Sequence, residues 1–439
     1  MKHSILAIAI AALVGAGEAQ ADNLLDSVAR QPQPQASTFN AIKSRLTVGG
    51  YGEAVMSRMM YSNNYKRYTD ASLYKHAGSF GQFDLPHVVV YLGYDFGKGW
   101  SMGSEIEFEH GGTESAIEIE EEETGEYESE IERGGEVALE QFWLQKQFSK
   151  AFHIRAGHLL VPVGGTNANH MPTEFFTVYR PEGENTILPC TWHETGVSLW
   201  GQLKDWRYEA MFIAGLDADR FGNAGWIHDG AGSPYEFKMA TAYAGAVRID
   251  NYSVKGLRLS VSGYLGNSAN NTLNYTDKYK GLHGTVAIGA FDFHYEGHNL
   301  VARGNFDYGH LSNSQEITTA NFNTRKDSPS PKTNVAKAAI ATGLEVGYDI
   351  FSPIASLHKE NQRFFLFGRY DYYDSMFKTV SGMTDEKEWG RSKITFGFNY
   401  YPISQIVVKG EWSERLLKSQ YNNEPTVSLG IAYCGIFHL

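Results

Sequence analysis

The side chains that could do chemistry in this chain are charged residues spaced two apart, and no catalytic motif accompanies them. The sequence contains no HExxH or GxSxG pattern and no pair of closely spaced cysteines. Its histidines are scattered, and His294 and His298, which are four residues apart, lie in an expected strand and turn rather than on a helix that could hold a metal pair. We therefore predict that the protein is not an enzyme and holds no cofactor. A hydrolase assembled from distant Ser, His and Asp residues is the remaining enzymatic alternative.

The spacing of these charged residues is that of β-strands with one apolar face. In the segment 100–110, apolar side chains alternate with Glu105, Glu107 and Glu109, and successive side chains of a strand point to opposite faces. Sixteen segments of this kind occur, many near the roughly 9–11 residues that cross a bilayer at a tilt. Aromatic residues gather where segments meet short turns, as in a membrane-interface girdle.

The links between these segments alternate between long and short. The long links are 61–79, 111–134, 162–193, 217–236, 267–283, 311–335, 374–389 and 415–425. The link 351–361 stands where a short turn is expected but is longer than the other short turns. Outer-membrane barrels have tight periplasmic turns and longer external loops. The fold class predicted is therefore all-β, a transmembrane antiparallel β-barrel of about 16 strands in the outer membrane of a Gram-negative bacterium, surrounded by lipid and lipopolysaccharide. A soluble two-sheet sandwich is the alternative.

The two ends of the chain frame this barrel. Residues 1–21 have a basic start, a short apolar run and an Ala-Gln-Ala ending, which predicts a cleaved secretory signal. Residues 22–44 are expected to form a periplasmic segment, and residues 45–439 the barrel.

The net charge of −12 argues against a nucleic-acid partner. Cys190 and Cys434 allow at most one disulfide, and two separate thiols are the simpler interpretation.

Charged side chains on the face opposite the apolar one would line an aqueous bore. The predicted pore-lining residues are Arg155, Arg207, Arg248, Arg258, Arg303, Arg363, Arg369, Lys393, Lys409, Glu105, Glu107 and Glu109. Three segments fit the alternation poorly, one of them the fifth strand, from which His158 would face outward. Val137–Phe148 changes phase, and Thr285–Tyr295 places Asp292 and His294 on the expected outer face.

The link Pro162–His193 is unlike an external loop, because it is rich in aromatic residues. We predict that it folds back into the barrel and constricts it. The residues expected at the constriction are Asn169, His170, Glu174, Arg180, Glu182, Glu184 and Trp192. Its glutamates facing wall arginines would set a field that selects polar solutes. A loop that packs over the rim is the alternative.

The link Gly111–Gly134 holds ten glutamates against one arginine. A solvated external loop is one interpretation. The other is a structural Ca²⁺ site, since Ca²⁺ takes carboxylate oxygens. The candidate ligands are Glu118, Glu120, Glu121, Glu122 and Glu123.

The stretch Arg155–Gly201 resembles outer-membrane porins of the phosphate-selective porin O/P-like group, notably those of Bacteroidetes. The resemblance rests on Gly157, Pro162-Val163-Gly164, Asn169-His170-Met171-Pro172, Arg180-Pro181, Leu188-Pro189 and Thr191-Trp192. It implies a homotrimeric sixteen-stranded channel that is constricted by the link between strands five and six. The phosphate-selective members have ladders of arginine and lysine, from which Glu105, Glu107 and Glu109 depart.

Together these features predict a porin for passive diffusion of small hydrophilic solutes and ions, with an anion preference of the phosphate-like kind as a variant. The alternative function is a surface-exposed barrel with a blocked pore that acts in binding or adhesion.

Overall fold

The computed structural model describes residues 45–110, 115–121, 127–133, 137–232, 238–272, 275–324, 330–384, 386–418 and 420–438. The predicted signal, 1–21, and the segment 22–44 lie outside this range. The strands are β1 (Leu46–Met59), β2 (Phe80–Asp84), β3 (His87–Gly97), β4 (Trp100–Glu109), β5 (Ser115–Glu121), β6 (Tyr127–Arg133), β7 (Val137–Ser149), β8 (Phe152–Leu160), β9 (His193–Leu203), β10 (Trp206–Ala214), β11 (Tyr243–Val254), β12 (Leu257–Asn267), β13 (Thr285–Gly297), β14 (Leu300–Leu311), β15 (Ala338–Asp349), β16 (Arg363–Lys378), β17 (Gly390–Ile403), β18 (Ile406–Leu416) and β19 (Glu424–His438).

The helices are short and lie in the links. They are α3 (Ala71–Tyr74), α4 (Gly165–Ala168), α5 (Glu182–Ile187), α6 (Tyr275–Lys278), α7 (Ser314–Phe322) and α8 (Ala355–Lys359), with 3-10 turns η1 (Tyr65–Tyr68), η2 (Ala218–Arg220), η3 (His228–Ala231) and η4 (Lys387–Trp389). Among the described residues, none of these helices is long and apolar enough to cross a membrane.

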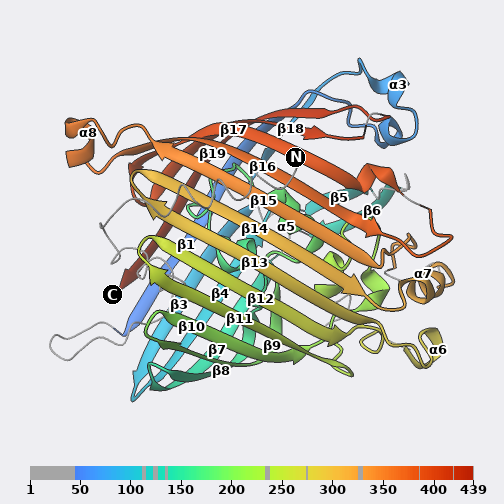
Figure 1. Ribbon diagram of the computed structural model, residues 1–439, viewed down its shortest axis with the longest axis horizontal. Helices are drawn as coiled ribbons and strands as arrows, with labels where there is room; N and C mark the ends of the chain where they lie inside the picture. The colour runs from blue at the N-terminus through green and yellow to red at the C-terminus, as the bar shows by residue number, and fades with distance from the viewer. Residues whose placement is uncertain are drawn as a thin grey trace.

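The strands form one antiparallel sheet that closes on itself (Figure 1). Closure comes from β1 and β19, which pair along their length from Thr47 opposite His438 to Met59 opposite Thr426. Both β2 and β3 pair with β1, so they are two pieces of one barrel strand, interrupted at Leu85 and Pro86. With the separate hairpin β5–β6 set aside, the wall has sixteen strands, which confirms the predicted fold class.

Side chains alternate across this wall as the sequence pattern predicts. In β12, Leu259 and Val261 are exposed on the outside, whereas Arg258, Ser260 and Ser262 are buried on the inside. Closure matters because an open sheet edge in hydrocarbon would leave backbone N–H and C=O groups without partners. The apolar outer face is then free to meet lipid.

The short turns gather at one end of the barrel and the long links at the other, as predicted. In Figure 1, α8 lies at the short-turn end, while α3, α6 and α7 lie at the opposite end. The turn between β3 and β4 depends on Gly99, whose φ is 77°. A Cβ there would lie 2.5 Å from the carbonyl oxygen of Gln147 in the next hairpin, so a larger residue does not fit.

Two departures from simple alternation have a structural cause. The β4–β7 register shifts between Glu105 and Ile106, so the extra residue Glu140 turns inward, where it is 1% exposed. Such a bulge explains the phase change predicted for Val137–Phe148. The expectation for β13 was wrong, because Asp292 is buried on the inner face rather than on the outer one.

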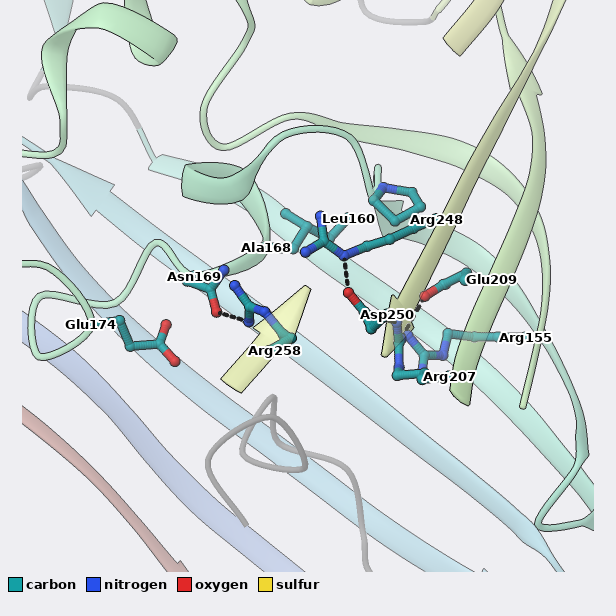
Figure 2. A pocket seen from close by; sticks show the side chains of 11 residues that line it. Arg155, Leu160, Ala168, Asn169, Glu174, Arg207, Glu209, Arg248, Asp250 and Arg258 are labelled. Atoms are coloured by element: carbon teal, nitrogen blue, oxygen red, sulfur yellow. Dashed lines mark hydrogen bonds and ion pairs between the residues drawn. The ribbon is translucent and has the colours of Figure 1, made fainter. Parts of the chain in front are cut away.

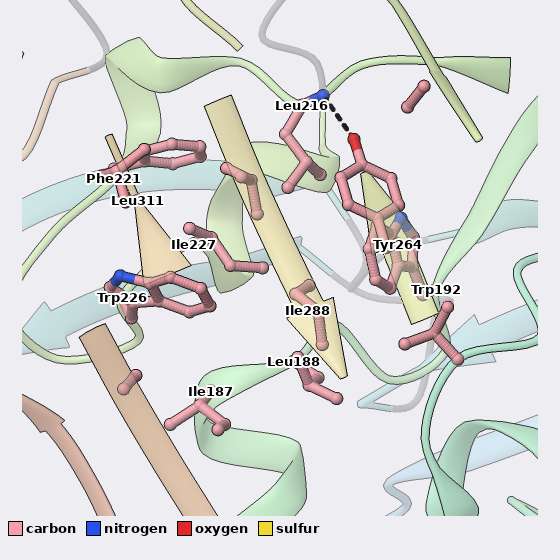
Figure 3. Packing of buried hydrophobic residues seen from close by; sticks show 14 of the residues in the cluster. Ile187, Leu188, Trp192, Leu216, Phe221, Trp226, Ile227, Tyr264, Ile288 and Leu311 are labelled. Atoms are coloured by element: carbon pink, nitrogen blue, oxygen red, sulfur yellow. Dashed lines mark hydrogen bonds between the residues drawn. The ribbon is translucent and has the colours of Figure 1, made fainter. Parts of the chain in front are cut away.

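The inner face of β13 is largely apolar, which is why the sequence pattern placed Asp292 on the wrong face. Val286 and Ile288 point inward with Asp292, and they pack into a large apolar cluster inside the barrel (Figure 3). This cluster joins inner-face residues of β10–β15 to the long links, from which Trp226, Ile227 and others are fully buried. The interior near the long-link end is therefore apolar in part, not lined by polar groups throughout as we expected. Both cysteines are free thiols.

The lipid-facing band predicts that a charged substitution lowers stability more at the middle of the bilayer than near its edge. We expect Val261→Arg, at the middle of β12, to lower the free energy of unfolding in bilayers by about 2–4 kcal/mol. The control Ile403→Arg, at the end of β17, should cost about 0–1 kcal/mol. Denaturant titration in lipid vesicles measures both values. Equal costs at the two positions would contradict a bilayer centred on the middle of the strands.

Candidate functional site

The link Pro162–His193, hereafter the inserted loop, lies inside the barrel. None of its residues is exposed, although before β9 begins at His193 it contains only the short helices α4 and α5. A link that packed over the rim would leave residues facing solvent. Figure 1 shows α5 within the outline of the wall, and its contacts reach β15 and β16 on that side.

On one side of the barrel, the inserted loop is held by charged wall residues that bind its backbone. The Lys409 ammonium of β18 donates to the carbonyls of Phe175 at 3.0 Å and Thr177 at 2.8 Å. The Glu411 carboxylate accepts the Val178 N–H at 2.7 Å. A polypeptide with no strand partner satisfies its polar groups in this way. Lys409, predicted to line the pore, is instead 2% exposed and anchors the loop.

The strongest anchor is Glu182 at the start of α5. Its carboxylate accepts hydrogen bonds from Lys393 at 2.7 Å, from Arg415 and from the Tyr373 hydroxyl. Burial raises the pKa of this carboxyl, but the Arg415 and Lys393 charges outweigh burial and hold the pKa well below its usual value of 4.5. Glu182 is therefore a fixed negative charge at neutral pH.

Further hydrogen bonds join the loop to β1, which lies two strands from β18, and to β11 and β12 on the far side of the barrel. The Arg180 guanidinium donates to the Tyr51 hydroxyl of β1 at 3.2 Å. Two wall arginines donate into the loop, Arg248 to the Gly164 carbonyl at 2.9 Å and Arg258 to the Asn169 side chain at 2.8 Å. The inserted loop thus spans the interior from β1 and β18 across to β11 and β12.

Four predicted arginines surround one cavity, with an empty volume of about 560 Å³ (Figure 2). Its charged lining residues are Arg155, Arg207, Arg248, Arg258, Glu174, Glu209 and Asp250. All four arginines come from β8, β10, β11 and β12, where they lie on the inner face toward the short-turn end. Four positive against three negative side chains leave the lining with an excess of one positive charge.

Most of these arginines are paired. Arg207 lies 2.6 Å from Glu209 and Arg248 lies 2.8 Å from Asp250. Arg155 differs, because its Nε donates to the neutral amide of Gln145 at 3.1 Å. Its Nη2 is buried and has no hydrogen-bond partner among the described residues. This is the one cavity arginine for which the structure gives no carboxylate partner within 4 Å in the described part of the chain.

A second cavity, of about 440 Å³, shares Asn169, Glu174 and Arg258 with the first. It continues toward β14–β16, where Arg303 lies 2.7 Å from Glu345. Arg369 nearby is paired with Asp371 at 2.7 Å, and Glu184 of the inserted loop also lines the space. Paired charges of both signs therefore continue beside the inserted loop.

The remaining predicted site residues lie elsewhere. Arg363 is half-exposed at the start of β16 and lies 3.5 Å from Glu296, away from both cavities. Trp192 is fully buried and packs on Tyr264 in the apolar cluster, so it does not face a passage. His170 is buried and contacts the Asn167 carbonyl at 3.0 Å.

Glu105 and Glu107 are buried on the inner face of β4, and Glu109 is half-buried near its end. Together with Glu140 of β7 they form an acidic wall on β4 and β7, and β7 adjoins β8, the strand of Arg155. The calcium prediction lies outside what the structure describes. Glu118, Glu120 and Glu121 belong to β5, whose side chains are not described, and Glu122 and Glu123 fall outside the described residues.

The sequence analysis missed two acids that order the arginine cavity. Asp250 binds both Arg248 and Arg207, and Asp292 lies 2.9 Å from both Arg248 and Arg258. Asp250 follows Arg248 by two residues on β11, so its inward parity was available from the pattern. Asp292 was not, because the inner face of β13 is mostly apolar.

Comparison with known proteins agrees with this geometry. No protein-family model matches the chain. An uncharacterized protein of Aquifex aeolicus is 26% identical over 401 residues, which are 89% of this chain and 80% of that protein. OmpF of Salmonella typhi, solved in complex with daunomycin, has a TM-score of 0.52 at 11% identity, covering 90% of this chain and 98% of that one. The anion-selective porin from Comamonas acidovorans has a TM-score of 0.51 at 11% identity, covering 90% and 100%.

The fold is that of the outer-membrane porins. At such low identity the likeness concerns the fold alone, and the side chains of the interior are this chain's own.

The anchoring of Glu182 predicts an acid-sensitive inserted loop. A carboxyl whose folded pKa is depressed stabilises the fold above its unfolded pKa, about 4.3, and loses that contribution as pH falls toward the folded pKa. Protection factors of the amides of α5 should therefore fall below about pH 4. Glu182→Gln should weaken them at pH 7 by about 3 kcal/mol, because it leaves Lys393 without its carboxylate partner and Arg415 with Glu424 alone. Hydrogen exchange with mass spectrometry measures this.

Glu414→Gln is the matched control, since Glu414 follows Glu411 on β18 but binds Asn423 in a link. Its α5 protection should equal that of the unmodified protein at every pH. Unchanged protection in Glu182→Gln would mean that the ion pairs do not hold the loop.

Proposed function

We propose that this chain is an outer-membrane porin that lets small hydrophilic solutes and ions diffuse passively, with a preference for small anions. The observation that carries the proposal is Arg155, a buried guanidinium at a polar cavity beside the inserted loop with no carboxylate partner given. Its side chain lines the cavity together with Arg207, Arg248 and Arg258. An anion entering that space gains a charge-assisted hydrogen bond.

The pairing of the other charges favours diffusion rather than tight binding. Arg207 and Arg248 already donate to Glu209 and Asp250, so an anion competes for them with fixed carboxylates. Conduction requires binding that is favourable enough to enter and weak enough to leave. The same pairing holds the side chains in place without any reacting partner, which supports a function that involves no chemical step.

A finer proposal follows from the resemblance to the phosphate-selective O/P-like group. Phosphate and similar oxyanions would use Arg155 and Arg258 as donors, while the acidic wall of Glu105 and Glu107 would repel them. We therefore propose a weak, phosphate-like preference rather than strict selectivity. Assembly as a homotrimer is part of this proposal, with exposed apolar side chains of the wall available for contacts between copies as well as with lipid.

The role of Arg155 can be tested by planar-bilayer recording across a KCl gradient. Removing one charge about 4 Å from a bound anion changes its energy by about 1 kcal/mol in water-like surroundings. Arg155→Gln should therefore lower the chloride-to-potassium permeability ratio by about fivefold. Arg363→Gln is the control, because that arginine lies away from both cavities and should leave the ratio unchanged. Equal shifts in both variants would show that the cavity does not set the ion preference.

A second function, a surface barrel with a blocked pore, is favoured by one observation. The apolar cluster fills part of the interior near the long-link end, and Trp226 at its centre is fully buried with its Nε1 donating to the Ala336 carbonyl at 3.1 Å. A barrel sealed by this cluster would serve binding rather than transport.

Trp226→Ala separates the two functions, at a cost of about 3–5 kcal/mol in stability. For a porin, we expect stepwise currents from the unmodified protein and from the variant. A sealed barrel would instead give currents only after Trp226 is removed. The same recordings on Phe322→Ala, an exposed residue of α7, control for nonspecific leakage.

A further inference from the structure

Three side chains on neighbouring barrel strands bring metal-ligating atoms together outside the arginine cavity. They are His87 at the start of β3 and Glu107 and Glu109 near the end of β4, and one ligand atom from each lies within 4.8 Å of the other two. The His87 Nδ1 is 2.8 Å from a Glu107 oxygen and 3.6 Å from a Glu109 oxygen. Donors 2.1 Å from a tetrahedral ion are about 3.4 Å apart. The observed spacing brackets that value.

The backbone fixes this arrangement. His87 is directly opposite Glu109 in the β3–β4 register, and Glu107 lies opposite Val89, one inward position along. The barrel strand made of β2 and β3 is interrupted at Leu85 and Pro86, immediately before His87. Across this break, the strand has one residue more than the facing part of β1, as in a β-bulge. Bulges re-aim side chains in a wall that otherwise alternates strictly.

A fourth residue on the adjacent strand points to a ligand. Glu53 of β1 is 5% exposed, and its Oε2 has no hydrogen-bond partner among the described residues. Its Oε1 lies 3.8 Å from the Nε2 of His87, on the side of the ring opposite the two glutamates. A buried carboxylate oxygen without a donor is costly. In metal sites, a carboxylate behind a ligating histidine accepts the other ring N–H and orients the ring.

We propose that His87, Glu107 and Glu109 form a binding site for a divalent transition-metal cation of the Zn²⁺ type, with Glu53 as the carboxylate that orients His87. Imidazole nitrogen and carboxylate oxygen are both ligand types that Zn²⁺ takes, and three protein ligands leave a fourth position open for water. Ca²⁺ and Mg²⁺ prefer all-oxygen ligands, so the imidazole argues against them. The cation would also offset the charge that the two glutamates concentrate at this end of β4.

The site is distinct from the predicted calcium site in Gly111–Gly134, and it does not depend on the proposed diffusion function. Binding can be measured on the purified full-length protein in detergent, without any current. The probe is ZnCl₂ added to protein that has been stripped with a chelator, followed by isothermal titration calorimetry. We expect one equivalent per chain, and Co²⁺ in its place should give the absorption of a tetrahedral complex.

Three conservative variants test the assignment. Glu107→Gln and His87→Gln should each lower the affinity for Zn²⁺ by 100-fold or more, because each removes a ligand. Glu53→Gln should lower it by about 10-fold, as expected for a group that orients a ligand. The control replaces Glu118, Glu120 and Glu121 of the acidic hairpin together with glutamine, which should leave the one-equivalent binding unchanged.

The proposal is overturned if the unmodified protein takes up no Zn²⁺, or if His87→Gln and Glu107→Gln bind it as the unmodified protein does. Loss of binding in the hairpin control alone would move the site to that hairpin and equally overturn it. Should the variants fail to fold, anomalous diffraction at the zinc edge from the unmodified protein decides the matter. A peak between His87 and Glu107 supports the site, and a peak elsewhere refutes it.

Discussion

The closure of the sheet between β1 and β19 is the constraint on which the rest of the structure depends. In hydrocarbon no water is present to bind a free strand edge, so every strand of the wall must have two neighbours. Sixteen strands satisfy this condition but enclose more space than inward side chains can fill. The remaining interior space must then be filled by the links between strands, and in this chain the long links fill it.

The links fill the two ends of the interior with different kinds of contact. Near the long-link end they form an apolar cluster around Trp226 with the inner face of β10–β15. Farther in, the inserted loop adds Ile187, Leu188 and Trp192 to this cluster, and its polar groups are held by charges, chiefly Lys409 and the ion pairs of Glu182. Charged anchors on one side and arginines on the other leave polar cavities beside the loop. This division is what makes a solute path with mixed charge physically reasonable.

Alternation and link lengths were enough to predict the strand number, the ends at which turns and links lie, and the inward side of most charged residues. They could not predict features that arise from contacts between strands. Glu140 faces inward only because of a bulge against β4, and Asp292 was assigned to the wrong face because the apolar cluster makes the inside of β13 look like an outside. The neighbourhood of His87 and Glu107 depends on strand register, which a single sequence does not give.

The central claim is that solutes pass through this barrel, and swelling of proteoliposomes in isosmotic solutes of increasing size tests it most directly. An open path beside the inserted loop predicts fast swelling with small hydrophilic solutes and a rate that falls steeply as solute size grows. Swelling no faster than that of protein-free liposomes, for even the smallest solute, would contradict the account.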